Sequence, residues 1–281
     1  MAGTYRTVKK IVTGQNKTDG AGVKLVRVIG YNDVKDFDPF LMLDAFDSTN
    51  SDDYTKGFPW HPHRGIETVT YLISGDIEHG DSLGNKGSIL DGDCQWMTAG
   101  SGIVHQEMPK ACERMLGAQL WINLPAKDKM VPPKYRDILS RNVPVVEENG
   151  NIVRIICGTY KGVHGAIQGD YVKPLYMDVD LKAGSEWTLD TDRDSTLFLY
   201  IVQGEGIFDT DGEKYISEKH AILFNEGDTM RVKATAKGVR FLLMSGKPLI
   251  KPIAWGGPIV MNTKEELDQA FRDLDEGNFI K

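Results

Sequence analysis

Four side chains in the first half of the chain have the types and the spacing of a metal site: His61, His63, His105 and Glu107. Side chains alternate faces along a strand, so the two members of each pair, two positions apart, point the same way. Two neighbouring strands could bring both pairs around one point. Three imidazoles and a carboxylate suit Fe, Mn, Ni, Cu or Zn. They suit six-coordinate metals best, because four protein ligands then leave two positions for substrate and dioxygen, whereas a closed tetrahedral zinc site leaves none.

A lone His-x-His pair is weak evidence, and here its surroundings add weight. Half of the six histidines fall in the two clusters, and each cluster lies beside a glycine-rich turn. His79, His164 and His220 have no such companion, so we expect them to be exposed or held by one hydrogen bond. The arrangement is an enlarged relative of the two-His, one-carboxylate triad of non-haem Fe(II) oxygenases.

Strands must carry these residues, because most of residues 5–250 read as short apolar runs interrupted by Gly, Asp and Asn. A proline-containing stretch at 124–133 reads as a connector between two halves. The C-terminus is the exception. Thr263 and Glu266 form a capping box ahead of apolar residues at helical spacing, which predicts a short helix. We expect the acidic run 273–276 to lie on a solvated face.

A faint internal repeat indicates a duplicated β barrel. The segment 71–75 resembles 200–204, and Gly92-Asp93 resembles Gly227-Asp228, with chance similarity between glycine-rich segments as the alternative. When the four candidate ligands are shifted along the chain by the intervals that separate these paired segments, they correspond to Asp190, Asp192, Arg240 and Leu242. An Arg and a Leu cannot ligate a divalent metal, and the two Asp read as turn residues. We therefore expect the second barrel to be metal-free.

Composition excludes several classes of protein. The length of 281 residues suggests two domains or one large barrel. Lys+Arg at 33 against Asp+Glu at 40 give a net charge of −7, which argues against direct nucleic-acid binding. We find neither the apolar stretch of a signal peptide nor a membrane-spanning run of ~18 apolar residues, so we expect no membrane association. Three scattered cysteines, Cys94, Cys112 and Cys157, favour a reducing, cytoplasmic location.

Two longer segments carry a family resemblance. Residues 57–75 resemble the first cupin motif, with Gly57, His61, His63, Glu67 and Gly75 at its positions, and residues 92–107 resemble the second. More narrowly, both resemble pirin, a bicupin family, as do residues 38–46, 95–100 and 257–263. The resemblance covers nearly the whole chain. It implies an all-β fold of two tandem cupin β-barrels (a bicupin) with a short C-terminal helix. We expect residues 1–133 to form a metal-binding N-terminal cupin domain, and residues 134–281 a metal-free C-terminal cupin domain with the helix.

The resemblance also bears on the carboxylate ligand. Generic cupins take it from the first motif, which would be Glu67 here, and strand parity alone does not exclude that residue. Pirins resemble one another in using the Glu two residues after the second-motif His, which is Glu107. The resemblance therefore implies Glu107 as the ligand, and we expect Glu67 beside the site, orienting a ligand or a water.

Aromatic and polar residues near the motifs suggest a substrate pocket. Phe58, Trp60, Trp96 and Met97 flank the two motifs and could line an apolar pocket for a flat aromatic substrate, with barrel core as the alternative for each. Gln119 shares a strand face with Trp121 and Asn123, and this face either looks into the site or away from it. Arg64 has the opposite parity to the adjacent His63, so we read it as structural.

The resemblance to pirin-type quercetin 2,3-dioxygenases implies a metal-dependent dioxygenase. Its partners would be an aromatic small-molecule substrate and dioxygen, and it would cleave flavonols such as quercetin with release of carbon monoxide. Fe(II) is the expected cofactor, with Ni, Mn, Cu or Zn as alternatives. Glu107 is the expected catalytic residue, because a ligating carboxylate can also accept the hydroxyl proton.

Two other functions remain open. Mammalian pirins are described as iron-dependent cofactors of transcription regulators. The chain could therefore be a non-enzymatic, iron- or redox-responsive cofactor that binds a protein partner such as a transcription regulator. A cupin isomerase or other non-redox enzyme is the third interpretation.

Overall fold

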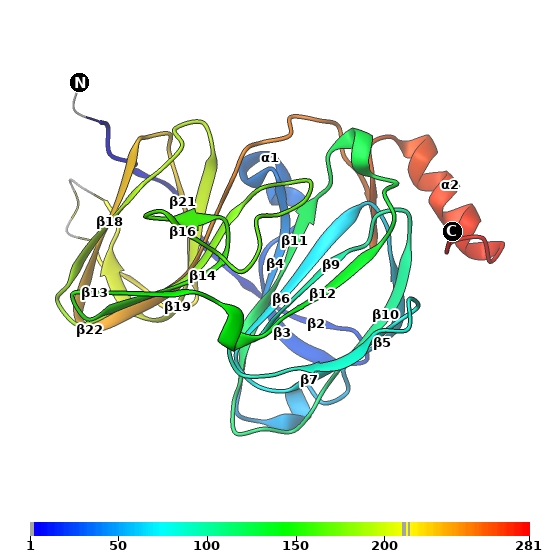
Figure 1. Cartoon of the computed structure of the whole chain (residues 1–281), viewed down its shortest axis with the longest axis horizontal. Coiled ribbons are helices and arrows are strands. Elements are labelled where there is room, and N and C mark those ends of the chain that lie inside the picture. Colours follow the sequence, from blue (N-terminus) through cyan, green and yellow to red (C-terminus); the bar gives the residue numbers. More distant parts are fainter. Residues whose placement is uncertain (1–2, 210–211, 213) are drawn as a thin grey trace. The chain divides into compact units, whose positions relative to one another are not determined.

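A computed structural model describes residues 3–209, 212 and 214–281, which form two compact units built mainly of strands (Figure 1). Unit 1 contains the described residues up to Gly14, with Lys35–Pro39 and Arg141–Pro248. Unit 2 contains Gln15–Val34, Phe40–Ser140 and Leu249–Lys281. The predicted all-β character, with a short C-terminal helix, is confirmed. No helix within the described ranges is long and apolar enough to cross a membrane.

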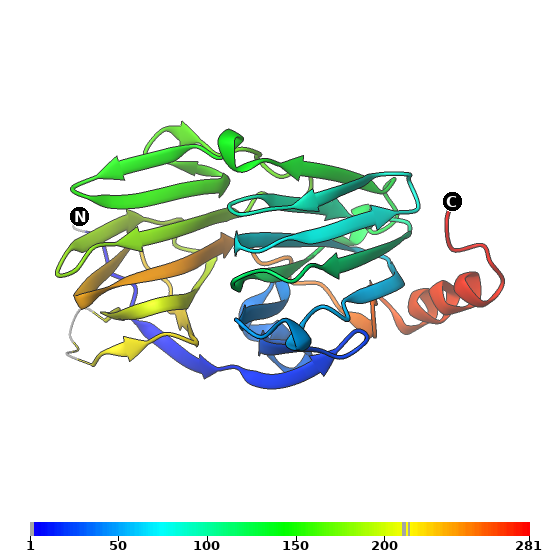
Figure 2. The ribbon, with the colours of Figure 1, turned by 90° about the horizontal axis from the view of Figure 1, so that it is seen from below.

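This division differs from the predicted single boundary between residues 133 and 134 in where the two ends of the chain pack. Strand β1 (Val8–Thr13) pairs with β21 (His220–Phe224) in unit 1. Helix α2 (Lys264–Asp275), drawn red in Figure 2, belongs to unit 2. A terminal strand completes its hydrogen bonds on whichever sheet edge is open, so chain order does not fix the unit that it joins.

Unit 2 is made of two antiparallel sheets that are not joined into one closed barrel. The larger has the order β12-β9-β6-β11-β4-β3-β2. Its strands are β2 (Gln15–Asp19), β3 (Val23–Ile29), β4 (Phe40–Ser48), β6 (Ile66–Ser74), β9 (Cys94–Thr98), β11 (Met115–Asn123) and β12 (Lys134–Ile138). The smaller has the order β5-β10-β7-β8, from β5 (Phe58–His63), β7 (Ile77–Asp81), β8 (Lys86–Ile89) and β10 (Ile103–Pro109). The short pair β23 (Ala254–Gly256) and β24 (Ile259–Met261) precedes α2.

Two apolar clusters hold these sheets together and leave polar residues between them. Along β10 buried and half-buried residues alternate, as expected for a strand with one face in a core. Ile103 packs in one cluster with Trp121, while Pro109 is paired with Ile77 of the other cluster. His105 and Glu107, which have the same parity, therefore lie on the inner face between the two clusters.

In unit 1, β15 (Thr159–Tyr160) and β16 (Val163–His164) form a short sheet of their own. The main sheet of unit 1 has the path β1-β21-β19-β22-β17-β14-β13. Its remaining strands are β13 (Val145–Glu148), β14 (Asn151–Cys157), β17 (Leu175–Leu181), β18 (Glu186–Asp190), β19 (Thr196–Ile207), β20 (Ile216–Ser217) and β22 (Thr229–Gly246). The sheet surrounds a core that includes Trp187 and Phe241. Arg240, which corresponds to His105 in the repeat, donates to both oxygens of Asp178 at 2.9 and 2.6 Å, and Leu242 is buried. These positions hold an ion pair and an apolar side chain.

The C-terminal helix begins as predicted. Thr263 Oγ1 accepts the backbone N–H of Glu266, whose carboxylate accepts the N–H of Thr263 in return, so the capping box is confirmed. The expectation that Asp273 lies on a solvated face is wrong. Its carboxylate is buried and accepts from Gln269 and from Arg64 of unit 2, because the helix packs this side against the sheet residues.

Candidate metal centre

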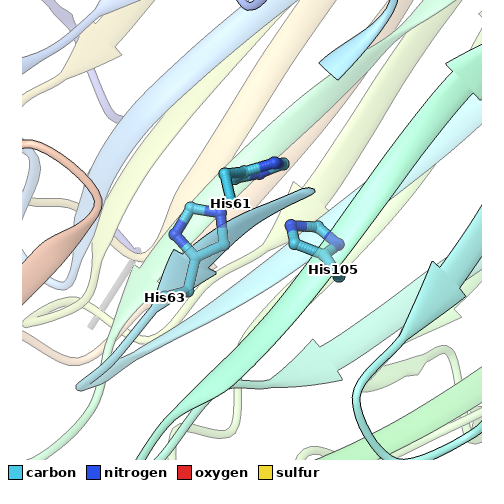
Figure 3. A group of neighbouring side chains, drawn as sticks. All are labelled: His61, His63 and His105. Atoms are coloured by element: carbon cyan, nitrogen blue, oxygen red, sulfur yellow. The ribbon is translucent and has the colours of Figure 1, made fainter. Parts of the chain in front are cut away.

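Three histidines converge on one point in unit 2 (Figure 3). His61 and His63 project from β5 and His105 from β10, and the two strands are antiparallel with His105 opposite His61. The ring centroids are 4.3 Å apart for His61 and His105, 4.9 Å for His61 and His63, and 5.0 Å for His63 and His105. One nitrogen from each ring can be chosen so that all three lie within 4.8 Å of one another. The same-face pairing of His61 and His63 is what strand alternation predicted.

The buried rings of His105 and His63 have the protonation that a metal ligand needs. His105 is 0% exposed, and neither of its ring nitrogens has a hydrogen-bond partner in the described part of the chain. Burial, together with His63 and His61, lowers the pKa of His105 well below its ordinary value. Burial and the neighbouring His61 lower the pKa of His63 to about 3. Both imidazoles are therefore neutral at pH 7 and offer the lone pairs that a metal ion needs.

Backbone carbonyls set the orientation of the His61 and His63 rings. His63 Nδ1 lies 3.1 Å from the carbonyl oxygen of Pro258, and His61 Nδ1 lies 2.8 Å from that of Pro59. A carbonyl only accepts, so each Nδ1 must donate its proton and each Nε2 keeps a lone pair. The three imidazoles fit a divalent transition-metal ion.

Glu107 lies beside this group but is engaged elsewhere. A register irregularity separates it from His105 in the pairing of β10 with β5. Both of its carboxylate oxygens lie 2.9 Å from Nε2 of Gln119, and one accepts from Thr70 Oγ1 at 3.1 Å. The group of atoms within 4.8 Å contains the three histidines and not Glu107.

A fourth histidine lies close to the site without having been singled out. His79 was expected to be exposed or held by one hydrogen bond; it is buried, with Nε2 3.4 Å from Asp81. Its ring stacks on Tyr135 at 4.6 Å and lies 5.6 Å from the ring of His105. His79 reaches this place because it is paired with Glu107 between β7 and β10. Finding it would require the register of these strands, which the sequence alone does not give.

The histidines open onto a cavity of about 690 Å³, within the range of ~300–1,000 Å³ usual for small-molecule sites. His61 and His63 line it together with the aromatic side chains of Tyr31, Phe58, Trp60, Trp121 and Trp255. Trp60 is 53% exposed and Tyr31 65% exposed, so the cavity is open to solvent beside them. Arg27, Asp44 and Gln119 form its polar side, where Arg27 donates to Asp44 at 2.9 and 2.7 Å.

Some of the residues expected around the site line the cavity and others do not. Phe58, Trp60 and Gln119 line the cavity. Met97 packs in the apolar cluster with Ile103, and neither it nor Trp96 is part of the cavity wall. On β9, Trp96 points to the opposite face from Met97.

Glu67 also lies on the other face. Its carboxylate accepts from Thr98 Oγ1 at 2.7 Å, and it is three positions from Thr70, whose side chain reaches Glu107. Residues three positions apart on a strand point to opposite faces, so the structure does not bring Glu67 to the histidines to orient a ligand. Burial raises the pKa of this carboxyl group.

Sequence reasoning missed much of the cavity wall. Tyr31, Trp255 and Pro258 follow or precede the motifs by long intervals, and the last two lie beyond the whole of unit 1 in the chain. Trp121 carried a signal, because it shares a strand face with Gln119. Arg27 and Asp44 are brought together by the pairing of β3 with β4.

Comparisons with known proteins place these features in a family. Residues 22–122 match the family model Pirin, and residues 176–280 match Pirin C-terminal cupin domain. A pirin-like protein of Caulobacter vibrioides is 45% identical over 98% of this chain and 99% of its own length. A crystal structure of quercetin 2,3-dioxygenase from Acinetobacter baumannii has a TM-score of 0.88 at 31% identity, covering 98% of both chains.

A more distant neighbour shares the fold alone. The bacterial pirin YhhW of Escherichia coli, solved in complex with nickel(II), has a TM-score of 0.66 at 17% identity, covering 85% of this chain and 98% of that one. Both units thus have the cupin fold, and the chain belongs to the pirin family.

Proposed function

We propose that this chain is a metal-dependent dioxygenase that cleaves flavonols such as quercetin with release of carbon monoxide. The observation that carries the proposal is the cluster of three histidines, two of which, His61 and His63, line a cavity that also has aromatic side chains in its wall. The aromatic side chains in the cavity wall favour a flat substrate, and His61 and His63 place two of the candidate ligands at the cavity surface. The similarity to a solved quercetin 2,3-dioxygenase supports the same substrate class.

The proposed cofactor is Fe(II), with Ni, Mn, Cu or Zn as alternatives, held by His61, His63 and His105 with Glu107 as the fourth ligand. When bound, the ion would act as a Lewis acid and a path for electrons between substrate and dioxygen. To join the histidines, the Glu107 carboxylate must exchange its hydrogen bonds with Gln119 for the ion. Its position two residues from His105 on the same inner face of β10 supports this assignment.

The side chains of the cavity have separate tasks in this proposal. Trp60, Trp121 and Trp255 hold the rings of the flavonol and exclude water from one side of it. A carboxylate oxygen of Glu107 would also accept the proton of the substrate 3-hydroxyl. Gln119 Nε2, which bonds both oxygens of this carboxylate in the structure, would be released when Glu107 turns to the ion. We also propose a cytoplasmic location, in accord with the small number of cysteines in the sequence.

The test is anaerobic loading with Fe(II), addition of quercetin and then admission of air. Loss of the flavonol absorbance together with release of carbon monoxide is the expected result. His63→Ala should abolish it, and His164→Ala, which changes an exposed histidine of unit 1, should leave it intact. An unchanged flavonol absorbance with Fe, Ni, Mn, Cu and Zn would overturn the enzyme proposal and favour a role in binding a protein partner.

A further inference from the structure

The last 28 residues of the chain, 254–281 (the C-terminal segment), bond directly to the strand that carries two of the histidines. The carbonyl of Pro258 faces His63 Nδ1 at 3.1 Å. At the next residue, the carbonyl of Arg64 accepts the backbone N–H of Val260 at 3.1 Å. His63, the last residue of β5, is thus bonded to the turn between β23 and β24, and Arg64, which follows it, is bonded to β24. The turn residues Gly257 and Pro258 also form part of the cavity wall.

A buried ion pair ties the rest of the segment to the same point. The Arg64 guanidinium donates to Asp273 Oδ2 of α2 at 2.7 Å and to the carbonyl of Phe279 at 2.8 Å. It also lies 4.2 Å from the centre of the Phe279 ring. Arg64 is buried, and a buried charge needs such partners. The residue that follows a metal-site histidine therefore anchors both α2 and the chain end.

Two glycines let the segment approach this closely. Gly65 has φ +79°, and a Cβ there would lie 2.0 Å from the carbonyl oxygen of Val260. Gly102, just before β10, has φ +145°, and a Cβ there would lie 2.5 Å from the carbonyl oxygen of Phe279. Lys129 Nζ bridges the carbonyls of Gly65 and Val260 at 2.7 and 2.8 Å. Both strands that carry the histidines thus meet the segment at positions without side chains.

We propose that the C-terminal segment is a positioning element of the metal centre, anchored by the Arg64–Asp273 pair. It holds the Pro258 carbonyl against His63, which fixes the ring orientation and leaves Nε2 free for the ion. Partners that orient a metal-bound histidine affect metal affinity by roughly 10- to 100-fold. Because coupling between two equilibria is reciprocal, docking of the segment strengthens metal binding and metal binding strengthens docking. This inference rests on the metal centre of the proposed function, and is independent of the substrate.

The test compares Asp273→Asn with Asp268→Asn in the full-length chain. Both change an Asp of α2 to Asn, but Asp268 is exposed. Zn(II) affinity is measured by chelator competition, and hydrogen exchange of the α2 amides is followed with and without Zn(II). We expect Asp273→Asn to weaken Zn(II) binding roughly 10- to 100-fold, and Asp268→Asn to leave it unchanged. In the unaltered chain, Zn(II) should slow exchange at residues 264–275.

A purely structural role for the pair would give faster α2 exchange in Asp273→Asn with unchanged Zn(II) affinity, and that result would overturn the proposal. Should Asp273→Asn fail to fold, the unaltered chain decides alone: α2 exchange that is the same with and without Zn(II) rejects the coupling. Since Zn(II) binding requires no turnover, coupling without flavonol cleavage would support this inference while the proposed function fails. Flavonol cleavage without any effect of Zn(II) on α2 exchange would support the proposed function and reject this inference.

Discussion

Replacing Gln119 by Leu tests whether Glu107 becomes a metal ligand. In the structure, Gln119 Nε2 lies 2.9 Å from both oxygens of the buried Glu107 carboxylate. Leu has a similar size but no donor. In the metal-free variant the Glu107 carboxylate therefore loses both bonds to Gln119 and, among the described residues, keeps the bond from Thr70. If Glu107 leaves Gln119 to bind the ion, the metal-bound protein loses little from the same substitution.

The size of the effect follows from the hydrogen bond. A bond to a charged group contributes about 1.5–3 kcal/mol, and its loss leaves a buried carboxylate short of a donor. The substitution should therefore lower the free energy of unfolding of the metal-free protein by this amount. Because the loss is confined to the metal-free state, metal binding should become tighter by the same free energy. At 1.4 kcal/mol per factor of ten, the metal dissociation constant falls roughly 10- to 100-fold.

The assay is chelator competition with Ni(II) or Zn(II), together with urea unfolding with and without the metal. Gln95→Leu is the control: Gln95 also lies in the larger sheet, where it is buried and Gln119 is half-buried, but its amide donates to Tyr135. It should change stability without changing metal affinity. Equal destabilisation of the metal-free and metal-bound Gln119→Leu protein, with unchanged affinity, would refute Glu107 as a ligand.

Three further predictions concern pH, packing and substrate. Arg64 lowers the pKa of Asp273 to about 2 from its ordinary value of 3.8, so the stabilisation by this pair is complete above pH 3.8 and is lost as the pH falls towards 2. The difference in urea midpoint between the unaltered chain and Asp273→Asn should accordingly be full at pH 6 and shrink below pH 3.8; a difference that does not change with pH would contradict it. Gly65→Ala should cost about 1–3 kcal/mol more unfolding free energy than Gly84→Ala, because both have positive φ but only Gly65 faces a backbone oxygen. Equal losses in urea titrations would show that the close approach has no energetic consequence. Tyr31→Ala removes an exposed aromatic side chain from the cavity wall, so it should raise the KM for the flavonol several-fold and leave the metal affinity unchanged. An unchanged KM would show that the substrate binds elsewhere.

Local patterns in the sequence predicted the all-β character, the C-terminal helix and the three imidazoles that the structure brings together. Alternation placed His61 and His63 on one face, the capping box started α2 at the right residue, and the long motifs identified the pirin family. These predictions succeed because each depends on residues within a few positions of one another, whose geometry the backbone of a strand or helix fixes.

Only the tertiary structure decided which face of each strand lies inside and which distant residues complete the site. Parity separates Trp96 from Met97 and Glu67 from Thr70, but it does not say which member of each pair lies on the inner face of its strand. The placing of His79 next to His105 depends on strand register, and Pro258 reaches His63 only because the chain returns to unit 2 after unit 1. Such contacts join residues far apart in the chain, so they are set by the competition among all strand edges and apolar faces at once, which no local pattern records.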